Sequence, residues 1–160
     1  MDHSSPRVQL DHIAVAVPDL ERSIAWYRDT LGFEEIERRL TTGVHTGMRS
    51  AVMRAGSAVV VLLEGTSAES QISKFVSAYG PGVQHFAIEV ENLDVAMQKF
   101  GCHDGVADTK IITGDGIRQI FLRRSDLSGA RVELIERRGG TFGDDSVREL
   151  FLAFEAADLF

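Results

Sequence analysis

The sequence lacks the features that mark several protein classes. It has 1 cysteine, Cys102, which excludes an internal disulfide and a cysteine-rich zinc module. Its longest apolar run, Ala58 to Leu63, is far shorter than the roughly 20 residues that cross a bilayer. Acidic residues outnumber basic ones by 24 to 17, which disfavours nucleic acid as a partner. The N-terminal residues have neither the basic start nor the apolar stretch of a signal peptide, so we expect a cytoplasmic protein without a membrane partner.

The remaining composition is that of an ordinary globular protein. Hydrophobic residues make up 44% and charged residues 26% of the 160 residues. A chain of this length corresponds to one domain, so we expect residues 1–160 to form a single domain.

The chain contains an internal repeat with an offset of 73 residues. The segment 10–20 (LDHIAVAVPDL) overlays 83–93 (VQHFAIEVENL), with His, Ala, Val and Leu matching in register. Each copy continues into a pattern typical of an amphipathic helix that ends at a glycine, Gly32 or Gly101. Asp19 and Asn92 precede these helices, where a side chain can cap free backbone N–H groups.

Strand patterns follow each predicted helix. The predicted hairpins are 49–53 with 58–64 and 117–122 with 130–136. We therefore predict an α+β fold of two βαβββ modules, forming one cupped mixed sheet around a metal site. The expected boundaries are 8–64 for the first module, 65–82 for a connector with a short helix, 83–136 for the second module and 146–158 for a C-terminal helix.

The strand that opens each module carries a histidine followed by a small residue on the same face. His12 shares its face with Ala14, and His85 shares its face with Ala87, whereas larger apolar residues occupy the opposite face. One such histidine is typical of a strand end. Two at the same repeat position favour a pocket lined by both.

Glu133 lies among apolar residues near the end of the second module. A buried carboxylate needs a partner, which could be a bound cation or a salt bridge to Arg131 or Arg137. Two imidazoles and one carboxylate form the ligand set of non-haem Fe(II) enzymes that activate oxygen. The fourth corner predicted by the repeat is Val61, which cannot bind a metal.

The chain resembles the vicinal oxygen chelate superfamily, and within it the catalytic half of 4-hydroxyphenylpyruvate dioxygenase and hydroxymandelate synthase. The matching stretches are LDHI at 10–13, WY at 26–27, VHT at 44–46, SQI at 70–72, GPGVQH at 80–85, QIF at 119–121, VELIER at 132–137 and GTFG at 140–143. The resemblance implies that His12, His85 and Glu133 hold Fe(II), with Mn, Co, Ni or Zn as alternatives. Arg131 departs from it, since that family has a phenylalanine at this position.

The same resemblance implies a set of substrate-binding residues: Gln71, Gln84, Gln119, Ser50, Phe121 and Phe142. The C-terminal helix is expected either to close the pocket as a lid or to pack on the sheet. Trp26 is expected in the core or between the repeats. The arginine doublets at 38–39, 123–124 and 137–138 are expected at solvated element ends.

From these residues we expect an oxidoreductase, an Fe(II) dioxygenase that oxidises a chelating α-keto acid. Its partners would be a small-molecule substrate and O₂, with a homodimer as a further possibility.

Three other functions remain open. A metal-dependent epimerase or lyase, of the methylmalonyl-CoA epimerase or glyoxalase type, resembles this chain at 14–20 and 80–85, although the fourth metal ligand usual in those epimerases would fall at Val61. Glu89 is a candidate base for that chemistry or a surface residue. A ring-cleaving dioxygenase would need His45 and Tyr79 as acid–base groups, and a resistance protein would bind a small molecule without catalysis.

Overall fold

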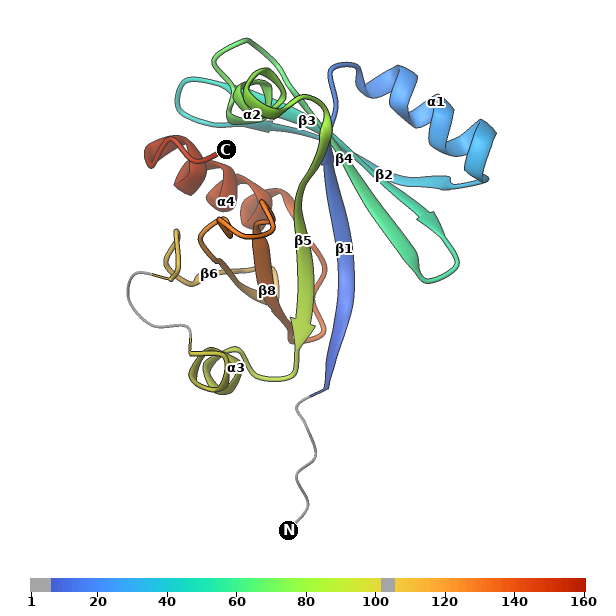
Figure 1. The fold of residues 1–160 in the computed structure, drawn as a ribbon. Helices are drawn as coiled ribbons and strands as arrows, with labels where there is room; N and C mark the ends of the chain where they lie inside the picture. The colour runs from blue at the N-terminus through green and yellow to red at the C-terminus, as the bar shows by residue number, and fades with distance from the viewer. Residues whose placement is uncertain (1–6, 102–105) are drawn as a thin grey trace. The chain divides into compact units, whose positions relative to one another are not determined.

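The computed structural model describes residues 7–101 and 106–160, so Cys102 lies outside the described part (Figure 1). None of the helices in that part is long and apolar enough to cross a membrane. The elements in chain order are β1 (Val8–Ala16), α1 (Leu20–Leu31), β2 (Glu34–Thr42), β3 (Gly47–Ala55), β4 (Ala58–Gly65), α2 (Gln71–Tyr79), β5 (Gly82–Val90), α3 (Leu93–Lys99), β6 (Ile112–Gly114), β7 (Ile117–Phe121), β8 (Val132–Arg137) and α4 (Asp144–Ala156).

The predicted α+β fold of two βαβββ modules is confirmed. The first module is β1-α1-β2-β3-β4 and the second is β5-α3-β6-β7-β8, with α2 in the connector. Sequence patterns implied β2 and β6 without locating them. The C-terminal helix α4 begins and ends two residues earlier than predicted.

The chain forms two compact units. Among the described residues, the His85 unit comprises 7–11 together with 85–101 and 106–146, and the His12 unit comprises His12–Gln84 together with Val147–Phe160. In the His12 unit the strand order is β2-β3-β4-β1, and in the His85 unit it is β5-β8-β7-β6. The β1–β4 and β5–β8 pairs are parallel, whereas the hairpin pairs are antiparallel.

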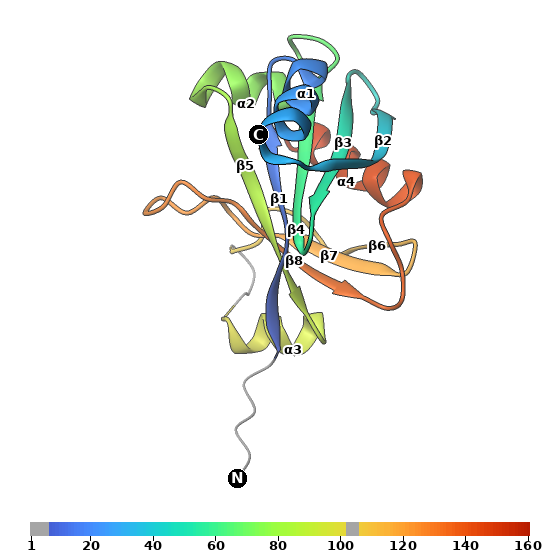
Figure 2. The ribbon, with the colours of Figure 1, turned by 90° about the vertical axis from the view of Figure 1, so that its right-hand side faces the viewer.

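Helix α1 covers one face of β3 and β4 (Figure 2). The Asp19 carboxylate caps it by accepting a 3.0 Å hydrogen bond from the Arg22 N–H, as predicted. Gly32 ends it with φ 71°, a left-handed conformation that glycine adopts without steric cost. Leu20 and Ile24 pack into the core of this unit with residues of β3 and β4.

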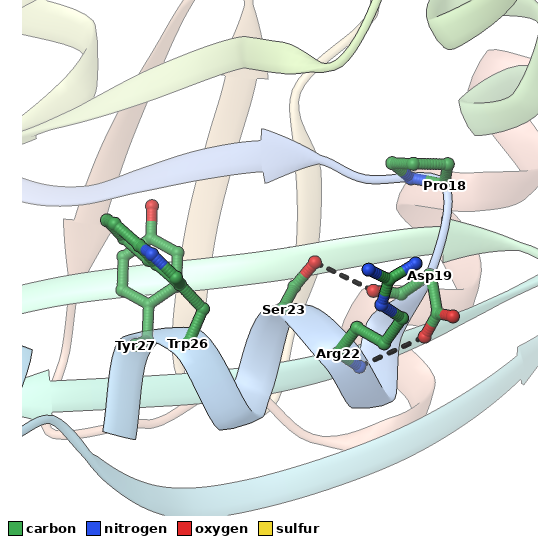
Figure 3. Close-up of a pocket in the computed structure, with 6 residues that line it drawn as sticks. All are labelled: Pro18, Asp19, Arg22, Ser23, Trp26 and Tyr27. Atoms are coloured by element: carbon green, nitrogen blue, oxygen red, sulfur yellow. Dashed lines mark hydrogen bonds between the residues drawn. The ribbon is translucent and has the colours of Figure 1, made fainter. Parts of the chain in front are cut away.

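Trp26 is not a core residue, although the core was one of the two places predicted for it. Its side chain is 52% exposed and borders a surface hollow with Arg22, Ser23 and Tyr27 (Figure 3). The Tyr27 ring contacts it edge-on, with the ring centroids 5.1 Å apart. On this helix Leu20 and Ile24 are the buried residues, which leaves Trp26 on the solvent side of α1.

In each module, a glutamate on the last strand caps the N-terminus of the module's helix. The Glu64 carboxylate accepts a 2.8 Å hydrogen bond from the Leu20 N–H, and the Glu136 carboxylate accepts one of 2.8 Å from the Leu93 N–H. An arginine on the neighbouring strand bonds to the same carboxylate in each module, Arg49 in the first and Arg118 in the second. The negative charge at each helix N-terminus also interacts favourably with the helix dipole.

The second half of α4 is anchored to the β2–β3 loop through Glu155. Its carboxylate accepts hydrogen bonds from the backbone N–H groups of Val44, His45 and Thr46 and from the Thr46 hydroxyl. Burial raises the pKa of Glu155, but these hydrogen bonds outweigh it and hold the pKa below its ordinary value.

Replacing Glu136 with Gln should lower the free energy of unfolding by about 1–3 kcal/mol, because the variant loses charge-assisted hydrogen bonds to a buried group. Burial raises the pKa of Glu136, but the Leu93 N–H, Arg138 and Arg118 outweigh it and lower the pKa below 4.5. A lowered folded-state pKa stabilises the fold above the usual carboxyl range, and this contribution disappears as the pH falls through the lowered pKa. Urea unfolding of wild type and variant, followed by circular dichroism at pH 7 and at pH 3, measures both effects.

The exposed Glu34 provides the control, since Glu34→Gln should change stability by less than about 0.5 kcal/mol. Equal stability of wild type and Glu136→Gln at pH 7 would contradict the capping role.

Candidate functional site

His85 and Glu133 lie together in the His85 unit. The parallel register of β5 and β8 places Ala87 opposite Glu133, so His85, two residues before Ala87, faces the same side of the sheet. His85 Nε2 is 3.3 Å from Glu133 Oε2. His85 is 7% and Glu133 1% exposed, so an imidazole and a carboxylate meet in the interior.

This pair fits a divalent metal ion. Imidazole nitrogens and carboxylate oxygens bind Zn²⁺ at about 2.0–2.2 Å, so two neighbouring ligands of one ion lie roughly 3 Å apart. The arginines that the sequence offered as salt-bridge partners of Glu133 each form an ion pair with another carboxylate, although the Glu133 charge also acts on Arg137. Arg131 pairs with Asp108, and Arg137 forms a two-pronged pair with Asp11 at 2.7 and 2.9 Å.

Apolar groups surround the pair. The Phe121 ring contacts the His85 ring edge-on, with centroids 4.9 Å apart, and Phe121 is paired with Glu133 across β7 and β8. Ala87, Ile117 and Ile135 form a buried cluster on the same side. Such a dry environment has a low dielectric constant, which strengthens any electrostatic interaction made there.

Gln119 adds an amide to this environment. It lies on the same face of β7 as Phe121, opposite Ile135, and is 0% exposed. Among the described residues, neither its Oε1 nor its Nε2 has a hydrogen-bond partner. Because an unpaired buried amide is costly, Gln119 is suited to bind a polar ligand atom.

Four other predicted site residues belong to the His12 unit: His12, Ser50, Gln71 and Gln84. His12 is 5% exposed and shares a face of β1 with Ala14 and Ala16. The register of β1, β4 and β3 places Ser50, which is 6% exposed, on that same face. Gln84, on β5, is buried.

Gln71 has a structural contact that the sequence did not reveal. Its Nε2 donates hydrogen bonds to Leu159 O at 2.7 Å and to Asp158 Oδ1 at 3.1 Å, which tie the start of α2 to the C-terminal residues. The Asp158 carboxylate also pairs with Lys74. These contacts explain why Gln71 is buried.

Phe142 and Glu89 lie near Arg137 in the His85 unit. The Arg137 guanidinium lies 5.1 Å from the centroid of the Phe142 ring, and Phe142 packs against the Ile117 and Ile135 cluster. Glu89 accepts a 2.8 Å hydrogen bond from Gln9 Nε2 and lines a surface pocket, which agrees with a surface residue better than with a buried base.

Replacing Gln119 with Leu should leave the free energy of unfolding unchanged or raise it by about 1 kcal/mol, because the unpaired amide is removed from the interior. Replacing Gln71 with Leu should lower it by about 1–2 kcal/mol, because two hydrogen bonds are lost. Parallel urea titrations compare the two glutamines directly. A Gln119→Leu protein less stable than Gln71→Leu would show that the Gln119 amide is satisfied in solution.

Comparison with known proteins identifies the family. Residues 9–134 match the Glyoxalase/Bleomycin resistance protein/Dioxygenase superfamily. The mitochondrial methylmalonyl-CoA epimerase of Mus musculus is 32% identical over 129 residues, which cover 79% of this chain and 71% of the relative. A variant of the Streptomyces coelicolor epimerase, solved with 2-nitronate-propionyl-CoA, is 28% identical with a TM-score of 0.66, over 81% of this chain and 96% of that one.

A variant of the 4-hydroxymandelate synthase of Streptomyces coelicolor shares the fold. It has a TM-score of 0.82 over 98% of this chain and 56% of that one, but only 23% identity. The expected Fe(II) dioxygenase activity, the oxidoreductase class and O₂ as a partner are therefore wrong, because the matching curated relatives with a stated activity are epimerases. The predicted fold and superfamily are confirmed. The chain belongs to the Glyoxalase/Bleomycin resistance protein/Dioxygenase superfamily.

Proposed function

We propose that this protein is a metal-dependent epimerase that moves the proton on the carbon between a thioester and a carboxylate, as in methylmalonyl-CoA. The observation that carries the proposal is the 32% identity to a methylmalonyl-CoA epimerase over 129 residues. A structure of a similar epimerase in complex with methylmalonyl-CoA supports the same substrate class.

His12, His85 and Glu133 are the proposed ligands of a divalent metal ion. All three are buried and each offers one ligand atom of a suitable type. Asp11, the residue before His12, is held by Arg137 at the end of β8, so the backbone next to His12 is anchored to the strand that carries Glu133. The repeat, which makes His12 and His85 equivalent, supports the same set.

A divalent ion at this site would polarise the substrate carbonyl and stabilise the negative charge that develops on its oxygen when the C–H bond breaks and the proton passes to a general base. Val61 stands where the repeat predicts a fourth ligand, so about three positions of an octahedral ion remain for substrate and water. The chain contributes the buried apolar side chains of Phe121 and Ile135, which would keep bulk solvent away from the developing charge. The unpaired Gln119 amide would orient the bound acyl group.

Incubation of the metal-loaded protein with one epimer of methylmalonyl-CoA in D₂O tests the proposal. We expect deuterium to enter the carbon between the two carbonyl groups, the second epimer to accumulate, and no oxygen to be consumed. Separate samples are loaded with Co²⁺, Mn²⁺, Ni²⁺, Zn²⁺ or Fe²⁺, because imidazole and carboxylate ligands bind each of these ions. A folded, metal-loaded protein that catalyses no exchange would refute this function.

Glu133→Gln and His85→Ala should lower kcat/KM for epimerisation by about 100-fold or more, because they remove metal ligands and several kcal/mol of charge stabilisation. Metal addition should raise the Tm of the wild type but not that of either variant. His45→Ala, which removes an exposed imidazole, is the matched control and should retain full activity. Retained activity and metal-dependent Tm in Glu133→Gln would exclude Glu133 as a ligand.

A further inference from the structure

Helix α1 carries a hollow on its solvent side that the candidate metal site does not use. The hollow has a volume of about 300 Å³ and is lined by Pro18, Asp19, Arg22, Ser23, Trp26 and Tyr27, all in the His12 unit. Arg22 and Trp26 are four residues apart, so their side chains project from one face of the helix, about 6 Å apart along its axis. Figure 3 shows the Trp26 ring at one end of the hollow and the Arg22 guanidinium at the other, with Ser23 between them.

The indole of Trp26 is an exposed ring on a firm support. Its side chain is 52% exposed, and the Tyr27 ring meets it edge-on with the centroids 5.1 Å apart. The Phe33 ring in turn meets Tyr27 edge-on at 5.5 Å, and both Tyr27 and Phe33 pack against the buried core of this unit. Because the indole is already held in place, a flat ligand can stack on it without first ordering a mobile side chain.

Arg22 provides the hollow with a cation that is not paired. Its guanidinium has no hydrogen-bond or ion-pair partner among the described residues, whereas Arg28 on the same helix is paired with Asp29. The Asp19 carboxylate caps the helix by accepting a hydrogen bond from the Arg22 backbone N–H. The guanidinium itself is therefore available to a ligand, and its planar set of N–H donors matches a phosphate group.

We propose that this hollow binds an adenine nucleotide, with the base stacked on Trp26 and the phosphates at Arg22. Stacking on an aromatic side chain suits the wide flat face of a purine, and the arginine supplies the phosphate contact. A neutral aromatic compound would leave the guanidinium unused, and inorganic phosphate would leave the indole unused. Two kinds of molecule carry the required group: a free adenine nucleotide and CoA, which ends in one.

The chain has 1 tryptophan, so tryptophan fluorescence reports on this hollow alone. Titration of the wild type with ADP should quench the fluorescence, because a stacked purine contacts the indole directly. Arg22→Gln should weaken ADP binding by about 10-fold or more, as expected for the loss of a charge-assisted hydrogen bond. Adenosine, which lacks the phosphates, should bind weakly and equally to the wild type and to Arg22→Gln.

Arg28→Gln is the matched control, because it removes an exposed arginine of the same helix from outside the hollow. It should bind ADP as the wild type does. Trp26→Ala, which is followed by calorimetry, should bind ADP about 10-fold more weakly. The replaced side chains are exposed, so circular dichroism should show an unchanged fold. A wild type that does not bind ADP, or ADP binding that is unchanged in either Arg22→Gln or Trp26→Ala, would overturn the proposal.

The source of the nucleotide is identified by kinetics with methylmalonyl-CoA and with methylmalonyl-pantetheine, which lacks the nucleotide. This arm alone rests on the proposed function. If the end of CoA occupies the hollow, Trp26→Ala should raise KM for the CoA ester about 10-fold without changing kcat, and should leave the pantetheine ester unaffected. If Trp26→Ala changes neither ester but loses ADP binding, the ligand is a free nucleotide. Absence of turnover would refute the proposed function, whereas the ADP measurements need no catalysis and test the hollow separately.

Discussion

The contact between His85 and Glu133 is the constraint on which the candidate site depends. An imidazole and a carboxylate lie 3.3 Å apart with almost no exposure, and apolar side chains surround them. Burying a carboxylate in such a place is costly unless a cation or hydrogen-bond donors accompany it. The parallel β5–β8 register fixes the pair, because a shift of one residue would turn either side chain to the opposite face.

The two carboxylates of β8 show how the duplicated module separates structure from chemistry. Glu133 and Glu136 are three residues apart, so they project from opposite faces of the strand. Glu136 caps α3 on one face, as Glu64 caps α1 in the other module. The opposite face carries Glu133, which takes no part in helix capping and belongs to the candidate site. The first module has the corresponding capping glutamate, Glu64, but has Val61 at the position that corresponds to Glu133.

Much of the fold was predictable because it repeats and because its helices carry clear caps and stops, such as Asp19 and Gly32. The burial of Glu133 followed from its apolar neighbours. Long-range contacts were not predictable, since no local pattern indicates that Gln71 bonds to Leu159 or that Arg131 is buried against Asp108. The dioxygenase assignment failed for a chemical reason, because two histidines and a carboxylate serve a Lewis-acid epimerase as well as an oxygen-activating enzyme.

X-ray absorption at the metal edge of the Co²⁺-loaded protein tests the central claim most directly. The account predicts one tightly bound ion per chain, with scattering from two imidazole rings and from a carboxylate oxygen at about 2.0–2.2 Å. The imidazole contribution should fall by half in His85→Ala. A protein that binds no stoichiometric Co²⁺, or a bound ion surrounded only by water oxygens, would contradict the metal site and the function proposed from it.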